Sequence, residues 1–212
     1  GCGVCVDNCL SGAISLVPRR TGRWFVSRTR HGPLVHAQLG VAQENSGKLV
    51  SLIRKEAKAL AAQRRATTLI CDGSPGIGCP VIASITGADL VLVVCEPTLS
   101  GLHDLQRVLD LVAQFRGRAA ICINKADLND AVCADIEQMA SQRAIPIVGR
   151  IRYDPAVTRA QTAQTSLVEF APLLPKNEAA EEIRSLWQRV QEHLHAADRS
   201  PQASLQMMEN RP

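Results

Sequence analysis

The feature that most restricts the fold is an alternation of short, continuously apolar segments with longer amphipathic ones. Periodicity predicts strands at 34–36, 67–71, 90–95, 119–123 and 147–151, and helices at 46–63, 81–86, 102–115 and 131–143. Strands that are apolar on both faces are typical of a parallel sheet covered by helices. Aromatic residues make up only 3% of the chain, so the core must be aliphatic, which disfavours a β-sandwich. We predict an α/β fold with a doubly wound, mostly parallel sheet that binds ligands at the carboxyl ends of its strands.

The composition changes near residue 30. Residues 1–30 are rich in Cys, Gly and Arg, and we predict short strands at 13–17 and 24–27 around a Pro-Arg-Arg-Thr-Gly turn. A segment of this size cannot form a core and would need a cofactor to hold it together. We therefore predict a small N-terminal segment, an α/β domain at 31–196, and a disordered tail at 197–212.

Three cysteines at the start of the chain have the spacing of iron–sulfur ligands. Cys2, Cys5 and Cys9 form C-x2-C-x3-C, which matches the last three cysteines of the bacterial ferredoxin run, although Leu10 stands where Pro is usual. Such spacing puts thiolates on one loop, where they can hold a 4Fe-4S cluster, and the first cysteine of the run would precede Gly1. Cys9 would bind this cluster or a second one. The alternatives are a zinc knuckle, which has no later C-x2-C or H-x3-H to complete it, and plain thiols.

The other five cysteines have no such spacing. Cys71, Cys95 and Cys122 occur in predicted apolar strands, and we expect them to be core thiols. Cys133 is in a predicted helix. Cys79 follows a glycine-rich loop, where a reactive thiol is the alternative to a structural one.

Asp72 directly follows the predicted strand 67–71. A carboxylate at the end of a buried strand is costly unless it holds a cation or water. In P-loop NTPases such an aspartate holds Mg²⁺, directly or through water. Gly73 and Gly76 allow a sharp turn in which a backbone N–H can reach a γ-phosphate. The alternative is that Asp72 caps the following helix.

The next two strands also end in polar loops. After the first comes Glu-Pro-Thr, in which Pro97 would turn the chain over a base pocket and Ser100 is the expected helix cap. After the second comes N-K-x-D, formed by Asn124, Lys125 and Asp127. An Asn amide can pair with a purine edge, and a Lys stem can lie along the ring. An ordinary strand-to-helix loop is the alternative.

Taken together, these segments resemble the MinD superfamily of P-loop ATPases that contains an inserted ferredoxin domain. The resemblance covers most of the chain to about Phe170 and is carried by five segments, Glu44–Leu49, Asp72–Val81, Glu96–Leu105, Asn124–Asn129 and Tyr153–Val157. It implies a MinD/ParA-like fold, ATP hydrolysis coupled to electron transfer or iron–sulfur handling, and a nucleotide-dependent homodimer.

The resemblance also implies roles for single residues. It puts Asp72 at Mg²⁺ and its attacking water, Gly76 in the γ-phosphate switch and Asn124 at the base. The loop with Tyr153 and Asp154 would flank the base, although Arg152 stands where Pro is usual in the family.

The phosphate loop itself is not in this sequence. Gly47-Lys48 after Gly40 is not a Walker A motif, because the interval is too long and Leu49 replaces the required Ser or Thr. We expect the true loop upstream of Gly1, before the ferredoxin insertion. The chain would then be an N-terminally truncated fragment that binds nucleotide poorly and does not hydrolyse it.

Charge and hydropathy limit which classes of binding partner are expected, namely nucleic acids, proteins or membranes. The net charge of +4 does not indicate nucleic acid binding. An arginine cluster is either a solvated hairpin face or a docking patch for an acidic redox partner; it comprises Arg19, Arg20, Arg23, Arg28 and Arg30. No apolar run is long enough to span a membrane, and the amphipathic helix predicted at 178–194 has a mixed polar face, so we expect a cytoplasmic protein without a membrane anchor.

Three functions remain open from the sequence. The first is a MinD-like ATPase with a 4Fe-4S module. The second is a ferredoxin-like electron carrier or redox sensor whose nucleotide domain is a scaffold. The third is a GTPase, in which Asp127 would accept hydrogen bonds from guanine.

Overall fold

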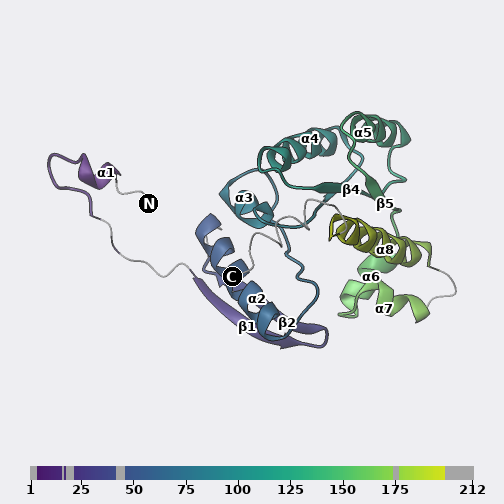
Figure 1. The fold of residues 1–212 in the computed structure, drawn as a ribbon, viewed down its shortest axis with the longest axis horizontal. Helices are drawn as coiled ribbons and strands as arrows, with labels where there is room; N and C mark the ends of the chain where they lie inside the picture. Colours follow the sequence, from purple (N-terminus) through teal and green to yellow (C-terminus); the bar gives the residue numbers. More distant parts are fainter. Residues whose placement is uncertain (1–3, 16, 18–21, 42–45, 174–176, 199–212) are drawn as a thin grey trace. The chain divides into compact units, whose positions relative to one another are not determined.

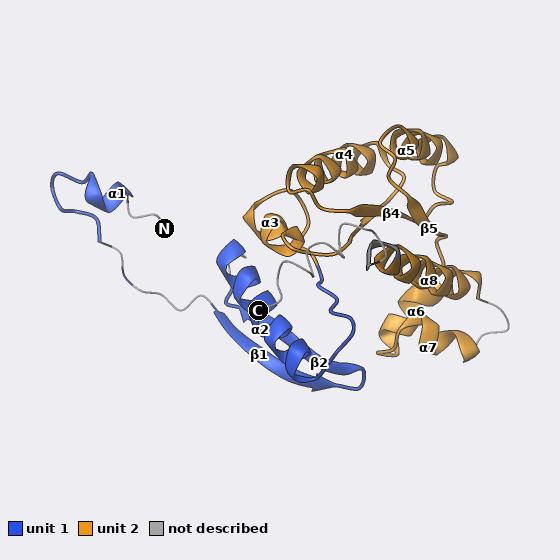
Figure 2. Cartoon of the chain, in the orientation of Figure 1, with its two compact units in different colours: residues 1–72 blue, residues 73–212 orange. Residues whose placement is uncertain are grey.

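The computed structural model describes residues 4–15, 17, 22–41, 46–173 and 177–198. They belong to two compact units, unit 1 (Gly1–Asp72) and unit 2 (Gly73–Pro212), shown in Figure 2. Some predictions lie outside the described residues, namely those for Cys2, Arg19 and Arg20 and those for the tail from residue 199 on.

Unit 1 holds a short helix α1 (Val4–Asp7), a hairpin of β1 (Gly22–Thr29) and β2 (Gly32–Leu39), and a longer helix α2 (Gly47–Gln63), as Figure 1 shows. The two strands are antiparallel and pair in register from Gly22 with Leu39 to Thr29 with Gly32. Helix α2 confirms the helix predicted at 46–63 and packs on β2. Ser46 caps it by accepting a hydrogen bond from the Leu49 N–H at 3.3 Å.

The hairpin corrects the prediction for the N-terminal segment. Strands were expected at 13–17, 24–27 and 34–36. The last two lie within β1 and β2 and are confirmed, but the described residues of 13–17 form no strand, and β1 pairs with β2. The turn between β1 and β2 explains why these two strands pair. Thr29 Oγ1 donates a hydrogen bond to the carbonyl of Gly32 at 2.7 Å and closes the turn. Gly32 has a φ of +133°, which glycine adopts without strain.

The strand predicted at 67–71 is also wrong. Residues 66–73 are exposed and have no regular secondary structure. A strand is stable only when a neighbour accepts and donates its backbone hydrogen bonds, and none of the described residues pairs with this segment. Sequence periodicity can identify the apolar residues of such a segment, but it cannot show whether a neighbouring strand is present to pair with it.

Unit 2 is built on a parallel sheet. Its strands are β3 (Val91–Cys95), β4 (Ala119–Asn124) and β5 (Ile147–Ile151), in the order β3-β4-β5. All three confirm predicted strands to within one residue. β4 has a neighbour on each side, and its residues 120–123 have no exposed surface. The α/β class and the parallel sheet are therefore as predicted.

Helices alternate with these strands. The predicted helices appear as α3 (Cys79–Ile85), α4 (Leu99–Gln114), α5 (Asp130–Gln142) and α8 (Glu178–Asp198). Three short elements were not predicted, α6 (Ala156–Thr162), α7 (Leu167–Phe170) and a 3-10 turn (Ala171–Leu173). Each is shorter than the window in which a helical period can be recognised.

The helices cover both faces of the sheet (Figure 1). Ile121 and Ile123 of β4 pack against the buried side chains of α4 and α5. Ala120 points to the opposite face, where it packs with Val148 of β5 and Val190 of α8. This alternation along one strand is the physical basis of the doubly wound arrangement.

Candidate functional site

Three loops meet the carboxyl edge of the sheet in unit 2. Residues 96–98 follow β3, residues 125–129 follow β4 and residues 152–155 follow β5. In a parallel sheet, ligands bind at this edge. Six of the predicted site residues lie on these loops or at the strand end that leads into one, namely Pro97, Asn124, Lys125, Asp127, Tyr153 and Asp154.

The loop after β3 is held close to the start of α4. Pro97 is buried, with less than 2% of its surface exposed. Thr98 caps the helix, since its Oγ1 accepts a hydrogen bond from the Gly101 N–H at 2.9 Å. A Cβ at Gly101 would overlap the carbonyl oxygen of Glu96, so only glycine fits there. The cap predicted at Ser100 is therefore wrong, because α4 begins earlier than expected.

The loop after β4 is joined to the loop after β3 by an ion pair. Lys125 Nζ lies 2.7 Å from Glu96 Oε1, and the backbone of Lys125 is left-handed, with a φ of +52°. Both side chains are more than a third exposed, so water screens the pair and its contribution to stability is small. The contact directs the Lys125 side chain toward the loop after β3. Asn124, at the end of β4, is half-buried beside it.

The loop after β4 is also joined to the loop after β5. Asp127 Oδ1 accepts a hydrogen bond from the Tyr153 N–H at 2.7 Å, and the Ala126 N–H donates to the Ile151 carbonyl at 2.9 Å. The Tyr153 side chain remains 54% exposed. One oxygen of Asp127 is therefore engaged in holding the loop after β5.

Asp154 ties the same loop to the start of α8. Its Oδ1 accepts a hydrogen bond from the Ala156 N–H and its Oδ2 accepts one from Asn177 Nδ2, each at 2.7 Å. Asn177 Oδ1 in turn accepts from the Ala180 N–H in the first turn of α8, at 2.7 Å. With both oxygens engaged, Asp154 shapes the loop.

Sequence reasoning missed a set of ion pairs around Arg152. Its backbone N–H and Nε donate to the two oxygens of Glu182, at 2.9 and 2.8 Å, and its guanidinium also pairs with Glu178. The hydrogen bond that Arg152 donates to Glu182, and then the charges of both carboxylates, raise the pKa of Arg152. The only signal in the sequence was an arginine where the family that the sequence resembles usually has proline.

Gly76 and Asp72 lie in different units. Gly76 has a φ of +85° in the bend before α3, a conformation that glycine adopts easily, so this part of the predicted turn is observed. Asp72 is exposed, at the end of unit 1. The role of each remains a prediction.

Of the predicted iron–sulfur ligands, the structure describes Cys5 in α1 and Cys9 just after it. Hydrogen bonds from the Ser11 hydroxyl and from backbone N–H groups, that of Ala13 first, lower the pKa of the Cys9 thiol. Within the described ranges, which exclude Cys2, no three His, Cys, Asp or Glu side chains are arranged to hold a metal ion.

The remaining cysteines divide by burial. Cys95 and Cys122 are core thiols, as predicted, and burial raises their pKa to about 12 and about 11. Cys133 is also buried, and its Sγ donates to the Ala126 carbonyl. Cys71 is exposed, contrary to prediction, because its segment forms no strand, and Cys79 is exposed at the start of α3.

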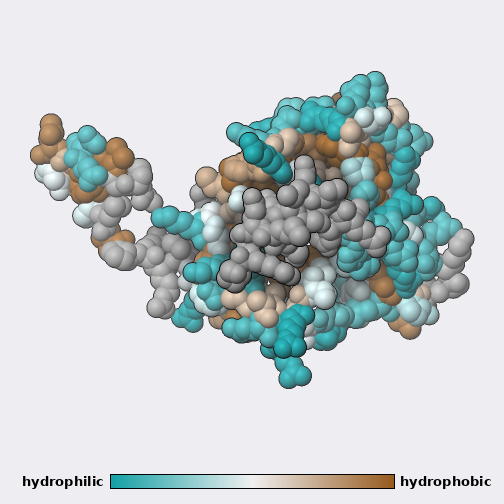
Figure 3. Space-filling view, viewed as in Figure 1, coloured by the Kyte–Doolittle hydropathy of each residue, from teal (hydrophilic) through white to brown (hydrophobic). Residues whose placement is uncertain are grey.

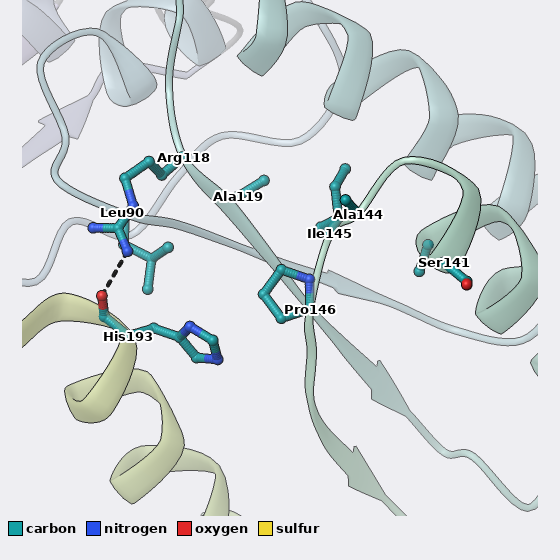
Figure 4. Close-up of a pocket in the computed structure, with 9 residues that line it drawn as sticks. Leu90, Arg118, Ala119, Ser141, Ala144, Ile145, Pro146 and His193 are labelled. Carbon is teal, nitrogen blue, oxygen red and sulfur yellow. Dashed lines mark hydrogen bonds between the residues drawn. The ribbon is translucent and has the colours of Figure 1, made fainter. Parts of the chain in front are cut away.

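A hollow of about 680 Å³ lies at the opposite, amino-terminal edge of the sheet (Figure 4). Leu90 and Ala119 line it at the starts of β3 and β4, and Arg118 donates a hydrogen bond to the His193 carbonyl at 2.6 Å. None of the predicted site residues lines this hollow. Among the residues that the structure describes, no helix has both the length and the apolar character needed to cross a lipid bilayer.

Comparison with curated proteins finds distant relatives. The uncharacterized protein MJ0578 of Methanocaldococcus jannaschii is 35% identical over 98 residues, which cover 46% of this chain and 34% of the relative. The uncharacterized ATP-binding protein MJ0547 of the same organism is 26% identical over 115 residues, 54% of this chain and 44% of the relative. The chain thus matches less than half the length of these relatives. No protein-family model matches it.

Comparison with solved structures shows the fold. The cell division protein MinD of Aquifex aeolicus has a TM-score of 0.56 at 17% identity, covering 79% of this chain and 68% of that one. MinD of Pyrococcus furiosus, a cell division ATPase, has a TM-score of 0.55 at 15% identity, covering 69% and 59%. MinD of Pyrococcus horikoshii, solved with Mg-ADP, has a TM-score of 0.53 at 14% identity, covering 68% and 56%. The chain has the fold of MinD-like P-loop ATPases.

Proposed function

We propose that this chain is part of a MinD-like ATPase and supplies the base-binding side of its nucleotide site. The observation that carries the proposal is the connection between the three loops at the carboxyl edge. Asp127 bonds the Tyr153 N–H and Lys125 pairs with Glu96, so the N-K-x-D loop is fixed to the loops on both sides. The MinD-like fold and a relative described as ATP-binding support the same function.

Adenine nucleotide is the proposed ligand. The half-buried amide of Asn124 would pair with the purine edge, and the stem of Lys125 would lie along the ring, with Tyr153 and Pro97 as walls. GTP is less favoured, because the Asp127 Oδ1 that would accept from guanine already accepts from the Tyr153 N–H.

The phosphate end of the site rests on the sequence. Asp72 offers an exposed carboxylate, a donor that suits Mg²⁺, and we propose that it holds this ion, directly or through water. Bound Mg²⁺ would neutralise the charge of the phosphates. Gly76 would turn a backbone N–H toward the γ-phosphate. We propose that the complete protein is a cytoplasmic homodimer when it binds nucleotide.

The second part of the proposal is a 4Fe-4S cluster bound by Cys2, Cys5 and Cys9 with a further ligand. The support is the environment of Cys9, where Ser11 Oγ lies 3.4 Å from the sulfur and hydrogen bonds lower the pKa of the thiol. Thiolates with such donors suit an iron–sulfur cluster, which would supply one-electron transfer. The exposed Arg23 and Arg28 on β1 would favour an acidic redox partner.

The test uses the protein expressed from the initiator methionine of its reading frame and purified without oxygen. Iron, acid-labile sulfide and the ATPase rate are measured together, with Asp72→Ala and Cys5→Ser as matched variants. We expect iron and sulfide in equal amounts, hydrolysis that Asp72→Ala abolishes, and cluster loss in Cys5→Ser. Zinc in place of iron would refute the cluster, and absence of nucleotide binding would refute the ATPase.

A further inference from the structure

Arg152 belongs to the loop after β5, residues 152–155, which is called the base-side loop below. It joins this loop to α8 through its backbone as well as its side chain. Glu182 receives the Arg152 backbone N–H on one carboxylate oxygen, at 2.9 Å, and the Nε of the same residue on the other, at 2.8 Å. Glu178, one turn earlier on the helix, pairs with the guanidinium. An ion pair that held only the tip of a long side chain would leave the backbone free, but this one fixes the loop itself.

The helix that supplies these carboxylates is firmly attached to the sheet. Val190 of α8 is buried against Val148 of β5 and Ala120 of β4. Gly149 of β5 lies so close to the helix that a Cβ there would meet the Leu186 side chain at 2.8 Å. Because α8 cannot shift easily against β5, the position of Glu182 relative to the strand end is set by core packing.

The same loop faces the N-K-x-D loop on its other side. Tyr153, next to Arg152, gives its N–H to Asp127, and Asp154 is bonded to Asn177 before α8. Residues 152–154 therefore form a bridge between α8 and the residues proposed to read the base. Loss of the Arg152 contacts is therefore expected to change the positions of Tyr153 and Asp127.

We infer that Arg152 is a positioning residue for the nucleotide site, and that with Glu178 and Glu182 it holds the wall that flanks the base. The inference rests on the proposed function. The contacts that hold this wall join charged groups, so nucleotide affinity is expected to depend on salt.

The variants for the test are Arg152→Ala, Arg152→Lys and Glu182→Gln, with Arg184→Ala as the matched control. Arg184 pairs with Glu181 on the same helix and contacts the Val168 carbonyl, not the base-side loop. All of these side chains are partly solvent-exposed, so the variants are expected to fold, which thermal melting checks.

Hydrogen exchange of the peptide containing residues 152–157 is measured in the 212-residue chain. We expect exchange to be about fivefold faster in Arg152→Ala, the upper range for an exposed ion pair, and unchanged in Arg184→Ala. Arg152→Lys keeps the charge but loses the planar fork, and is expected to fall between them. Equal exchange in wild type and Arg152→Ala would overturn the inference whether or not nucleotide binds.

The dissociation constant of a fluorescent ATP analogue is measured in the protein expressed from its initiator methionine, at low and high salt. We expect Arg152→Ala and Glu182→Gln to weaken binding about fivefold at low salt, and the difference to shrink in 1 M salt, where charges are screened within about 3 Å. Weakening that persists undiminished in high salt, or that Arg184→Ala shares, would overturn the positioning role. A wild type that binds no nucleotide would overturn the proposed function instead.

Discussion

The two compact units differ in how their apolar side chains are covered. In unit 2 a parallel sheet is packed on both faces, and Ile121 and Ile136 have no exposed surface. In unit 1 none of the described residues is buried, and Ile70 and Val41 are 75% and 97% exposed. The segment around α1 also exposes apolar surface (Figure 3). The comparison teaches that apolar residues in a strand-like pattern form a core only where neighbouring strands and helices are present to cover them.

The largest expected effect tests this difference directly. Ile121→Ala in β4 should lower the free energy of unfolding of unit 2 by about 3–4 kcal/mol, because it leaves a cavity among fully buried neighbours. Ile70→Ala, the same substitution at an exposed position of unit 1, should change stability by less than about 0.5 kcal/mol. Urea unfolding of Ile121→Ala in a Trp24→Phe background follows unit 2 through Trp187, and that of Ile70→Ala in a Trp187→Phe background follows unit 1 through Trp24.

Similar losses in the two variants would break the comparison. A costly Ile70→Ala would mean that residues 67–71 are covered in solution, and that the strand predicted there forms against a partner. A nearly neutral Ile121→Ala would mean that unit 2 lacks a packed core.

Thiol reactivity should separate the cysteines in the same way. Burial raises the pKa of Cys122 from 9.0 to about 11, so at a given pH it has about 100-fold less thiolate than an ordinary cysteine, apart from any steric protection. Cys71 and Cys79 are exposed and should react with iodoacetamide quickly in the native protein. Mass spectrometry of tryptic peptides after short exposures gives the rate at each site. Fast native labelling of Cys122 would contradict the buried core, and full denaturation is the control in which all sites react.

The buried thiols also predict how the stability of unit 2 depends on pH. Unfolded cysteine ionises near 9.0, whereas Cys122 and Cys95 in the folded unit ionise at about 11 and about 12. The protonated form is favoured by folding, so the contribution is complete below about pH 9 and is lost as pH rises toward 11–12. Urea midpoints measured from pH 7 to 10 should fall above pH 9, and Cys122→Ala should reduce that fall. A flat profile would indicate that these thiols are not buried.

Sequence patterns gave the fold of unit 2 almost completely and that of unit 1 only in part. The strand at 147–151 was placed to the residue, because continuous apolar runs between helices identify strands buried on both faces. In unit 1 the strands at 24–27 and 34–36 were predicted, but the turn was expected between 13–17 and 24–27. The observed turn depends on a local hydrogen bond between Thr29 and Gly32, which periodicity does not detect. The segment 67–71 was wrong because its stability depends on a neighbour.

The candidate site shows the same limit. Asn124, Lys125 and Asp127 could be picked out because a motif on consecutive residues marks them. The contacts that fix their loops could not, because Glu182 meets Arg152 across 30 residues and nothing in the local sequence of α8 distinguishes it from other surface glutamates. Long-range polar contacts depend on how helices pack, and this is known only once the fold is known.

The smallest expected effects concern partly exposed polar contacts, one in each unit. Glu96→Gln removes the charge that pairs with Lys125 in unit 2, and Ser27→Ala removes the hydroxyl that lies 2.9 Å from His36 Nε2 in the unit 1 hairpin. Each should lower the free energy of unfolding by less than about 1 kcal/mol, because water competes for both contacts. Urea unfolding followed through Trp187 in a Trp24→Phe background, and through Trp24 in a Trp187→Phe background, measures each unit separately.

Equal small losses would sharpen the comparison, since the units would then differ in apolar burial and not in polar contacts. A loss in Ser27→Ala as large as that in Ile121→Ala would mean that polar contacts in the hairpin, and not apolar burial, are the main source of stability in unit 1.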